Sequence, residues 1–522
     1  MNLCETVLGI ELGSTRIKSV LLDRQHRPIA SGAYDWENHL IDGVWTYSMD
    51  EVTTGIRECY AELKRDVFEK FGEKITTLGG IGISGMMHGY LVFDKDKNIL
   101  TEFRTWRNTM TAEAAEKLSN LLDFNMPQRW SISHLYQAIL NKEEHLPRLS
   151  YLTTLSGYIH WILSGERTVG IGEASGMFPI DPNTLDFDEK RIKIVDKLFD
   201  DAGYSWRFRD IMPKVTVAGV CAGFLTEDGA RFLDPDGDLM PGVKLAAPEG
   251  DAGTGMVATN SVRVGTANVS AGTSAFAMFV VDHSPKAHLG IDMITTPTGK
   301  TVAMVHSNTC TSDINAWVNL FDEFSKMCGL ELSKNELYSM LFRKALEGED
   351  ECGGLLSYNM ISGEDVVGLN EGRAMFVRGQ NSEFSLANFM RSHLMSAIAT
   401  IKLGLDILNA EEPVRVNRIC AHGGFFKTAE VGQRILSAAF AAPVSVLSTA
   451  GEGGPYGMAL LAAYMIWKND GETLEDYLDS VFSDAEAVTV TATDKETDGF
   501  NKYADRYKNG LMIEHTAIES ID

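Results

Sequence analysis

Two short turns rich in glycine and hydroxyl residues are the clearest candidates for chemistry in this chain. Residues 7–12, an apolar segment, lead to Gly13-Ser14-Thr15, and residues 267–270 lead to Ala271-Gly272-Thr273-Ser274. Small residues let backbone N–H groups converge on an anion, and Ser and Thr hydroxyls add donors with little bulk. The pair predicts a nucleotide whose phosphates are held between two domains, although either turn alone is also typical of an ordinary hairpin.

Composition limits the protein classes to which the chain can belong. Its 522 residues exceed one usual hydrophobic core, so we expect two domains of roughly 250 residues each. A net charge of -25 argues against nucleic acid or a membrane surface as partner, because both are polyanions. No segment approaches the ~18 apolar residues of a membrane span. The N-terminus lacks the features of a signal peptide, so we expect a cytoplasmic protein. The seven scattered cysteines predict reduced, mostly buried thiols.

The first half of the chain has the pattern of an α/β domain with a helical insertion. Apolar strands and turns alternate over residues 7–34, and they are followed by helical spacing over 52–71 and a short buried strand at 81–84. From about 111 to 210 the pattern becomes helical, with helices predicted at 133–141 and 152–163. We expect this insertion to cover one side of the first domain.

The order of strand, phosphate turn and strand begins again after Val264-Gly265, which marks a second domain. The predicted domains are therefore 1–259 and 260–522, with a hinge near 259–266. In the second domain, Ser385 is the predicted N-cap of a long amphipathic helix that runs to a linker at Glu411.

Two glycine-rich segments follow this helix. A strand at 416–421 leads into His422-Gly423-Gly424-Phe425, and a helix is expected to open there, which is a favourable place for a nucleotide. Gly451-Glu452-Gly453-Gly454 precedes an apolar helix at 458–464. Glycines at both segments also serve close packing.

Six segments in this order resemble the FGGY family of carbohydrate kinases, and most of all its xylulokinases. They are residues 9–18, 84–89, 248–255, 270–274, Gly423-Gly424 and 451–463. The resemblance covers roughly residues 7 to 465. It implies an α/β fold of two ribonuclease H-like domains, as in the actin and hexokinase superfamily, with sugar and ATP in the cleft between them.

The resemblance also implies roles for individual residues. Asp251, expected in a loop of small residues, matches the family's catalytic base, although Asp beside Gly also orders its own turn. Glu11 stands where the family usually has Asp, and with Asp251 it is expected to hold Mg²⁺ through water. The residues expected at ATP are Gly13, Ser14, Thr15, Lys18, Gly272, Thr273, Ser274, Gly423, Gly424, Phe425, Gly453 and Gly454.

The sugar site implied by the resemblance is altered in this chain. Met87 and His88 match the family's Met-His-Gly loop, and Trp106, Asn108 and Glu173 lie in altered versions of two other sugar-site segments. Met86 and Ala252 replace the Gln and Asn that xylulokinases tend to carry. Because an unpaired buried polar group is costly, these changes alter which hydroxyl pattern fits.

The resemblance implies an ATP- and Mg²⁺-dependent kinase for the terminal hydroxyl of a ketopentose such as xylulose. L-ribulose, L-xylulose, L-fuculose, gluconate and glycerol remain alternative substrates. An actin-like switch ATPase and a sugar sensor without kinase activity are alternatives of another class. The expected partners are a sugar and ATP, with a homodimer as a family-level expectation. Asp234–Asp238 superficially suggests a calcium loop, but Pro235 interrupts it and Leu245 replaces its bidentate Glu.

Overall fold

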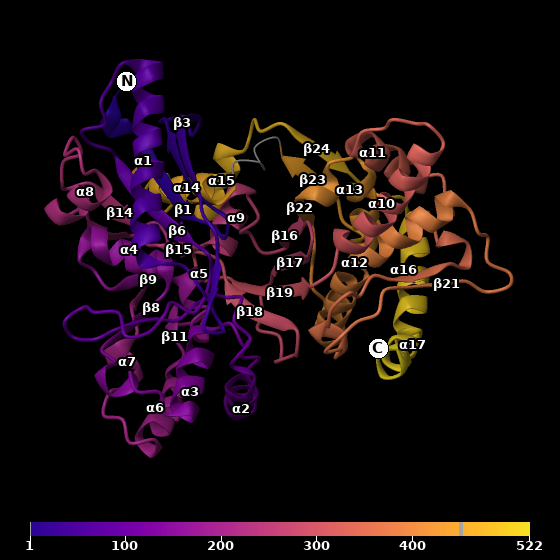
Figure 1. Cartoon of the computed structure of the whole chain (residues 1–522). Helices are drawn as coiled ribbons and strands as arrows, with labels where there is room; N and C mark the ends of the chain where they lie inside the picture. Colours follow the sequence, from indigo (N-terminus) through magenta and orange to yellow (C-terminus); the bar gives the residue numbers. More distant parts are fainter. Residues whose placement is uncertain (1, 448–452, 522) are drawn as a thin grey trace. The chain divides into compact units, whose positions relative to one another are not determined.

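The computed structural model describes residues 2–447 and 453–521 and divides into two compact units (Figure 1). The first unit comprises Met1–Val262, Met293–Thr301 and Gly451–Asp484, and the second comprises Arg263–Asp292, Val302–Ala450 and Ala485–Asp522. Each unit is built on a mixed sheet of parallel and antiparallel strands with packed helices. The predicted α/β architecture with two domains is therefore confirmed. Gly451 and Glu452 lie outside the described residues.

The first unit is organised around β1 (Val7–Leu12). On one side β1 pairs with β2 (Arg16–Leu22), which pairs with β3 (Pro28–Asp35), and both pairings are antiparallel. On the other side β6 (Gly80–Gly85) runs parallel to β1, and β14 (Lys244–Ala246) runs parallel to β6. The sheet is completed by β13 (Cys221–Phe224) at the edge and β15 (Glu249–Gly250), which pairs with the end of β6.

The second unit repeats this order of pairings. β16 (Thr266–Ala271) pairs antiparallel with β17 (Ala275–Val280), which pairs antiparallel with β19 (Thr301–Ser307). On its other side β16 is parallel to β22 (Arg418–His422), which is parallel to β23 (Val444–Leu447). The edge strands are β18 (Ile291–Thr295) and β24 (Ala487–Val490). In both units the first hairpin carries a predicted phosphate turn.

Small residues allow helices to approach the first sheet closely. α14 (Gly453–Trp467) packs on β1 and β6, and α9 (Asp251–Ala258) packs on α14. A methyl group added to Gly457 would overlap the carbonyl oxygen of Thr254 in α9. The glycine is therefore required by the close approach of these two helices. α1 (Met49–Phe71) packs on β2 and β3.

The remaining elements surround these sheets. In the first unit they are β4 (His39–Ile41), β5 (Val44–Thr46), β7 (Leu91–Phe93), α2 (Ala112–Leu122), α3 (Ser131–Asn141), β8 (Tyr151–Thr153), α4 (Leu155–Ser164), β9 (Thr168–Gly170), α5 (Ile171–Ala174), β10 (Ile180–Asp181), β11 (Asp186–Phe187), α6 (Glu189–Asp201), α7 (Phe208–Ile211), β12 (Lys214–Thr216), α8 (Glu227–Leu233) and α15 (Leu474–Val481). In the second they are α10 (Thr311–Met327), α11 (Lys334–Ala345), β20 (Leu356–Tyr358), β21 (Met375–Val377), α12 (Leu386–Glu411), α13 (Val431–Phe440), α16 (Asp494–Asn509) and α17 (Leu511–Ser520).

Three details differ from the sequence-based expectations. The helix predicted from residue 152 begins at Leu155. Thr154 is its N-cap, and the Thr154 hydroxyl accepts the Gly157 N–H at 3.4 Å. Residues 151–153 form β8 instead, because so short an apolar segment does not distinguish a strand from a helix. No helix opens directly at Gly423-Gly424, because a 3-10 turn intervenes before α13. Glu411 ends α12 instead of lying in a linker, whereas the predicted Ser385 N-cap is confirmed.

No helix within residues 2–447 and 453–521 is long and apolar enough to cross a membrane. All seven cysteines are thiols in the described chain. Four are buried, whereas Cys4, Cys221 and Cys328 are exposed.

A lysine supplies the cation at the segment that superficially suggests a calcium loop. Lys64 Nζ lies 2.5 Å from Oδ1 of the buried Asp234 and 2.9 Å from Asp236 Oδ2. We predict that Lys64→Met, which leaves Asp234 without its cation, lowers the free energy of unfolding in urea by about 3 kcal/mol. Lys74→Met, which removes an exposed ion pair to Asp238, should cost at most about 0.5 kcal/mol. Equal losses would contradict the prediction.

Candidate active site

Three strands of the first unit end at one edge of its sheet. Both β1 and β15 pair in parallel with β6. Glu11 of β1 and Glu249 of β15 each lie opposite Ser84 of β6. Met87 therefore follows β6, and Asp251 follows β15, at the edge where β1 carries Glu11. Ligands of α/β sheets bind at such carboxyl ends.

Asp251 is the first residue of α9, whereas the sequence placed it in a loop. Its Oδ1 accepts the N–H of Met87 at 3.1 Å and that of Ala252 at 3.0 Å. The side chain is half-buried, and burial raises the pKa of its carboxyl above the ordinary value. Two backbone donors thus fix one oxygen of a carboxyl whose proton affinity is increased, which suits a base.

Glu173 and Glu249 lie beside Asp251, and both are fully buried. Burial, together with Asp251 and Glu249, raises the pKa of Glu173 well above its ordinary value, although the nearby Thr154 hydroxyl favours the charged form. Neither carboxyl oxygen of Glu173 has a hydrogen-bond partner in the described chain. Glu173 therefore presents a carboxyl group at the edge that carries Asp251, and its raised pKa lets it donate a hydrogen bond as well as accept one.

Glu11 faces the same edge. Burial raises its pKa to about 7, with a further increase from Asp251 and an opposing effect of Lys18, which pairs with it across the β1–β2 hairpin. A methyl group added to Gly454 would lie 2.5 Å from Glu11 Cδ and closer still to Oε1. The longer Glu side chain is thus accommodated by a glycine.

His88 lies at the edge, but both of its ring nitrogens have protein partners. Nδ1 donates to the carbonyl of Gly176 at 3.0 Å, and Nε2 accepts from Arg129 Nε at 3.2 Å. Burial, followed by Arg129, lowers the pKa of His88 to about 3, so the imidazole is neutral. A sugar hydroxyl would have to displace one of these partners.

Asn108 and Trp106 differ in their surroundings. The Asn108 amide accepts the Trp45 N–H at 2.9 Å and donates to the carbonyls of Trp45 and Thr105 at 2.8 and 3.0 Å. Asn108 is therefore engaged with the backbone around β5. Trp106 is 41% exposed, so its ring remains open to solvent.

Two aromatic side chains, Trp36 and Tyr47, hold the backbone of the turn Gly13–Thr15. Trp36 Nε1 donates to the carbonyl of Gly13 at 2.7 Å, and the Tyr47 hydroxyl donates to that of Ser14 at 2.5 Å. The rings of Trp36 and Tyr47 stack with centroids 4.3 Å apart. Because the carbonyls of Gly13 and Ser14 point into the protein, the turn is suited to presenting N–H and hydroxyl groups, and Thr15 is exposed.

The turn Gly272–Ser274 is fixed by the start of α10. The Thr311 N–H and hydroxyl donate to the Gly272 carbonyl, and the Cys310 N–H donates to that of Thr273, at 2.8–3.0 Å. Thr273 is exposed. Each unit therefore presents a hairpin turn of the same kind.

Beside this second turn, Gly423 follows β22 in a conformation that favours glycine (φ +107°). A methyl group there would overlap the Ala271 carbonyl oxygen. Gly424 has open space around it, whereas the Phe425 ring is buried and lies 6.0 Å from that of Phe342. Phe425 thus contributes its side chain to the core.

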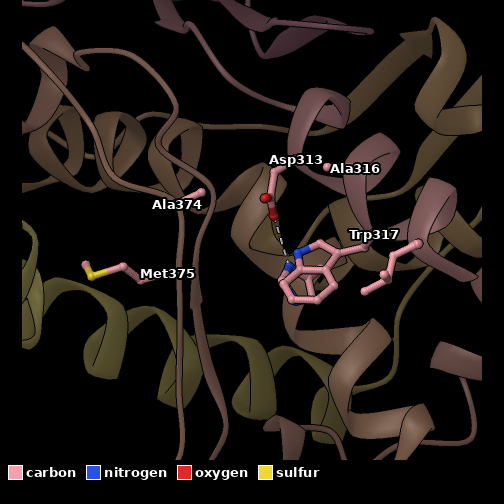
Figure 2. Close-up of a pocket in the computed structure, with 7 residues that line it drawn as sticks. Asp313, Ala316, Trp317, Ala374 and Met375 are labelled. Carbon is pink, nitrogen blue, oxygen red and sulfur yellow. Dashed lines mark hydrogen bonds and ion pairs between the residues drawn. The ribbon is translucent and has the colours of Figure 1, made fainter. Parts of the chain in front are cut away.

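The second unit also contains a pocket of about 240 Å³ that sequence reasoning did not single out (Figure 2). Trp317 and Asp313 of α10 line it together with His393 of α12, and Asp313 Oδ2 lies 3.1 Å from His393 Nδ1. The Ser357 hydroxyl is 2.8 Å from the same nitrogen. These contacts link α10, α12 and β20, which indicates a packing role.

Comparison with known proteins identifies the family of this chain. Residues 6–232 and 267–466 match the models of the N-terminal and C-terminal domains of the FGGY family of carbohydrate kinases. The chain is 20% identical to a xylulose kinase of Lactococcus lactis over 99% of both proteins. A xylulose kinase structure from Rhodospirillum rubrum superposes with a TM-score of 0.79 at 16% identity, covering 98% of this chain and 99% of that one. A gluconate kinase from Lactobacillus acidophilus gives 0.79 at 16%, covering 97% and 98%. This chain belongs to the FGGY family of carbohydrate kinases.

Proposed function

We propose that this carbohydrate kinase transfers the γ-phosphoryl group of ATP to the terminal hydroxyl of a ketopentose such as xylulose. The observation that carries the proposal is the Asp251 carboxylate, fixed by the Met87 and Ala252 N–H groups at the edge that carries Glu173. The match to the xylulose kinase of Lactococcus lactis supports the substrate class.

Asp251 acts as the general base in this proposal. Its Oδ1 holds two backbone donors, so we assign Oδ2 to the substrate hydroxyl. As the hydroxyl oxygen attacks the γ-phosphorus, Asp251 accepts the proton and ADP leaves. Glu173 binds other sugar hydroxyls, Met87 contributes the neighbouring wall, and Trp106, His88 and Asn108 shape the site around them.

We assign the sugar to the predicted domain 1–259 and ATP to the predicted domain 260–522, with the Gly13–Thr15 turn as an additional phosphate contact. The phosphates contact the Gly13–Thr15 and Gly272–Ser274 turns, with Lys18 as a positive charge. The adenosine contacts the backbone of Gly423–Phe425 and of Gly453-Gly454. Turns whose carbonyls already have protein donors are suited to this task. The Gly13 and Gly272 N–H groups donate to the Arg16 and Ser274 carbonyls at 3.1 and 2.9 Å, so we assign the phosphates to the hydroxyl groups and to the N–H groups of the residues that follow each glycine.

Mg²⁺ fits Glu11 and Asp251, which lie close enough for Asp251 to raise the pKa of Glu11. In the described chain no group of three or more His, Cys, Asp or Glu side chains could hold a metal ion. The two carboxylates would therefore hold Mg²⁺ through water, with phosphate oxygens as further ligands. When bound, the ion would neutralise charge on the phosphates.

Charges at the site favour an uncharged sugar over gluconate. Besides burial, the Asp251 carboxylate raises the pKa of both Glu11 and Glu173, whereas Lys18 pairs with Glu11 across the hairpin and Arg129 donates to His88. A sugar acid would bring another carboxylate into this surrounding, and like charges repel strongly where water is excluded.

The kcat/KM of the enzyme should fall as the pH is lowered, and this fall should begin at a higher pH than it would with carboxyl groups of ordinary pKa. Burial and then Asp251 raise the pKa of Glu11 to about 7, and burial raises that of Asp251. Both groups act when ionised, and a raised pKa keeps a carboxyl protonated to higher pH. We therefore predict that kcat/KM rises between about pH 5 and 8, the range set by these free-enzyme groups. A flat profile over this range would contradict the prediction.

The proposal is tested by ADP release with ATP and Mg²⁺ over a panel of sugars. The panel contains D-xylulose, L-xylulose, L-ribulose, L-fuculose, glycerol and gluconate. A ketopentose should raise the rate at least about tenfold, and gluconate should not, because discrimination follows differential transition-state binding. Phosphorus NMR of the product should show the ester at the terminal carbon. ADP release that no sugar stimulates would refute the proposal.

A further inference from the structure

Glu249 is a fully buried carboxyl group to which the sequence analysis gave no role. It lies in β15, two residues before Asp251, and its side chain reaches α5. Oε2 accepts the Glu173 N–H at 2.9 Å, and Oε1 accepts the Gly172 N–H at 3.3 Å. One side chain thus connects the strand before Asp251 to the helix that carries Glu173.

The chain around this carboxyl group is shaped to fit it. A methyl group added to Gly172 would lie 2.5 Å from Glu249 Oε2, and one added to Gly170 would overlap Oε1. The Gly170 N–H also donates to the carbonyl of Pro248 at 2.7 Å, next to Glu249 in sequence. Two glycines therefore leave the space that the carboxyl group occupies.

The position of Glu173 depends on this arrangement. A methyl group on Gly250 would overlap Glu173 Oε2, so the Glu173 carboxyl group lies directly against the residue before Asp251. The backbone of Glu173 is held by Glu249, whereas its own carboxyl oxygens have no hydrogen-bond partner in the described chain. Apart from the neighbouring Thr154 hydroxyl, the contacts of its backbone and stem fix where those oxygens point.

Packing alone does not account for Glu249. Burying a carboxyl group costs free energy, and an apolar side chain of similar volume would fill the space at lower cost. An apolar side chain would, however, leave the Gly172 and Glu173 N–H groups without acceptors. The two carboxyl oxygens of Glu249 therefore hold the backbone of Gly172 and Glu173 in place.

We propose that Glu249 is a positioning residue of the sugar site, which holds Glu173 beside Asp251 by binding the backbone of α5. The inference rests on the proposed function, because it assigns Glu173 to the sugar. It implies that loss of Glu249 changes sugar binding selectively, since its contacts reach no residue of the phosphate turns.

The test compares Glu249→Ala and Glu249→Gln with the wild type, using the sugar that the panel identifies. Glu249→Ala should raise KM for the sugar at least about tenfold, with KM for ATP within about twofold, as expected when a positioning contact is lost. Glu249→Gln keeps one acceptor for the Glu173 N–H, so its sugar KM should remain within about threefold of the wild type.

Glu364→Ala is the matched control. Glu364 is a buried carboxyl group of the second unit that accepts the N–H groups of Asn308 and Thr309 at 3.1 and 3.0 Å. Its loss should leave the sugar KM unchanged. An equal rise in sugar KM for both alanine variants would overturn the inference, as would a wild-type sugar KM in Glu249→Ala.

Gly172→Ala tests the same inference if Glu249→Ala does not fold. Its added methyl group should displace the Glu249 carboxyl group and raise the sugar KM, with KM for ATP unchanged. A wild-type sugar KM in this variant would also overturn the inference. A wild-type enzyme that phosphorylates no sugar would refute the proposed function itself, and this inference with it. An active wild type with unaffected variants refutes the inference alone.

Discussion

Asp251→Asn lowers kcat of the sugar-dependent reaction by about 1000-fold, because an amide cannot accept the hydroxyl proton. The Asn side-chain oxygen still accepts the N–H groups of Met87 and Ala252, so the geometry of α9 is retained. The sugar KM should therefore change little. Single-turnover measurements with saturating sugar separate this loss of chemistry from a loss of binding.

Asp188→Asn is a control with matched local structure. Asp188 is the N-cap of α6, and its Oδ1 accepts two backbone N–H groups, from Lys190 at 2.8 Å and Arg191 at 3.3 Å. This change should leave kcat within about twofold of the wild type. If both variants lose activity equally, the effect lies in the folding of helix ends, and Asp251 is not the base.

The parts of the site that the sequence predicted are local in the chain. Gly13–Thr15 and Gly272–Ser274 each join two strands of one hairpin, so the residues that form the turn also define its place. Asp251 could be assigned because its neighbours are small and because it matches the catalytic base of the family that the chain resembles. The local pattern had marked the glycine-rich turns, and the family resemblance added the catalytic and sugar-site residues.

The parts that the sequence could not supply depend on distant partners. Glu249 binds N–H groups 76 and 77 residues away, and no spacing in the sequence joins them. Asn108 was expected at the sugar, yet its amide is engaged by Trp45, 63 residues away. His88 likewise finds a partner in Gly176. Side chains of the expected type can thus be occupied by contacts that only the fold reveals.

Long-range packing also decides how the first unit is composed. α14 lies far along the chain, but it packs on β1 and β6 of the first unit (Figure 1). Its glycines and apolar residues predicted a closely packed helix, without indicating the sheet on which it packs. Gly454, expected at ATP, lies against Glu11 as a result.

Gly454→Ala should reduce kcat/KM for MgATP by about 100-fold, because a small misplacement of a group that acts on the phosphates is costly. The three atoms nearest to an added methyl group all belong to the end of the Glu11 side chain. A flexible carboxylate moves more easily than backbone, so the expected change is displacement of Glu11 with the fold retained. The melting temperature and the sugar KM should remain close to those of the wild type.

Glu11→Asp provides the decisive comparison, since its shorter side chain leaves room for the methyl group. If the loss in Gly454→Ala arises from displacement of Glu11, the double variant Glu11→Asp/Gly454→Ala should be more active than Gly454→Ala alone. Their coupling would show that the glycine is required by the extra methylene of Glu11. Strictly additive losses would instead mean that Gly454 acts through its own backbone, and that Glu11 does not share its role at the metal.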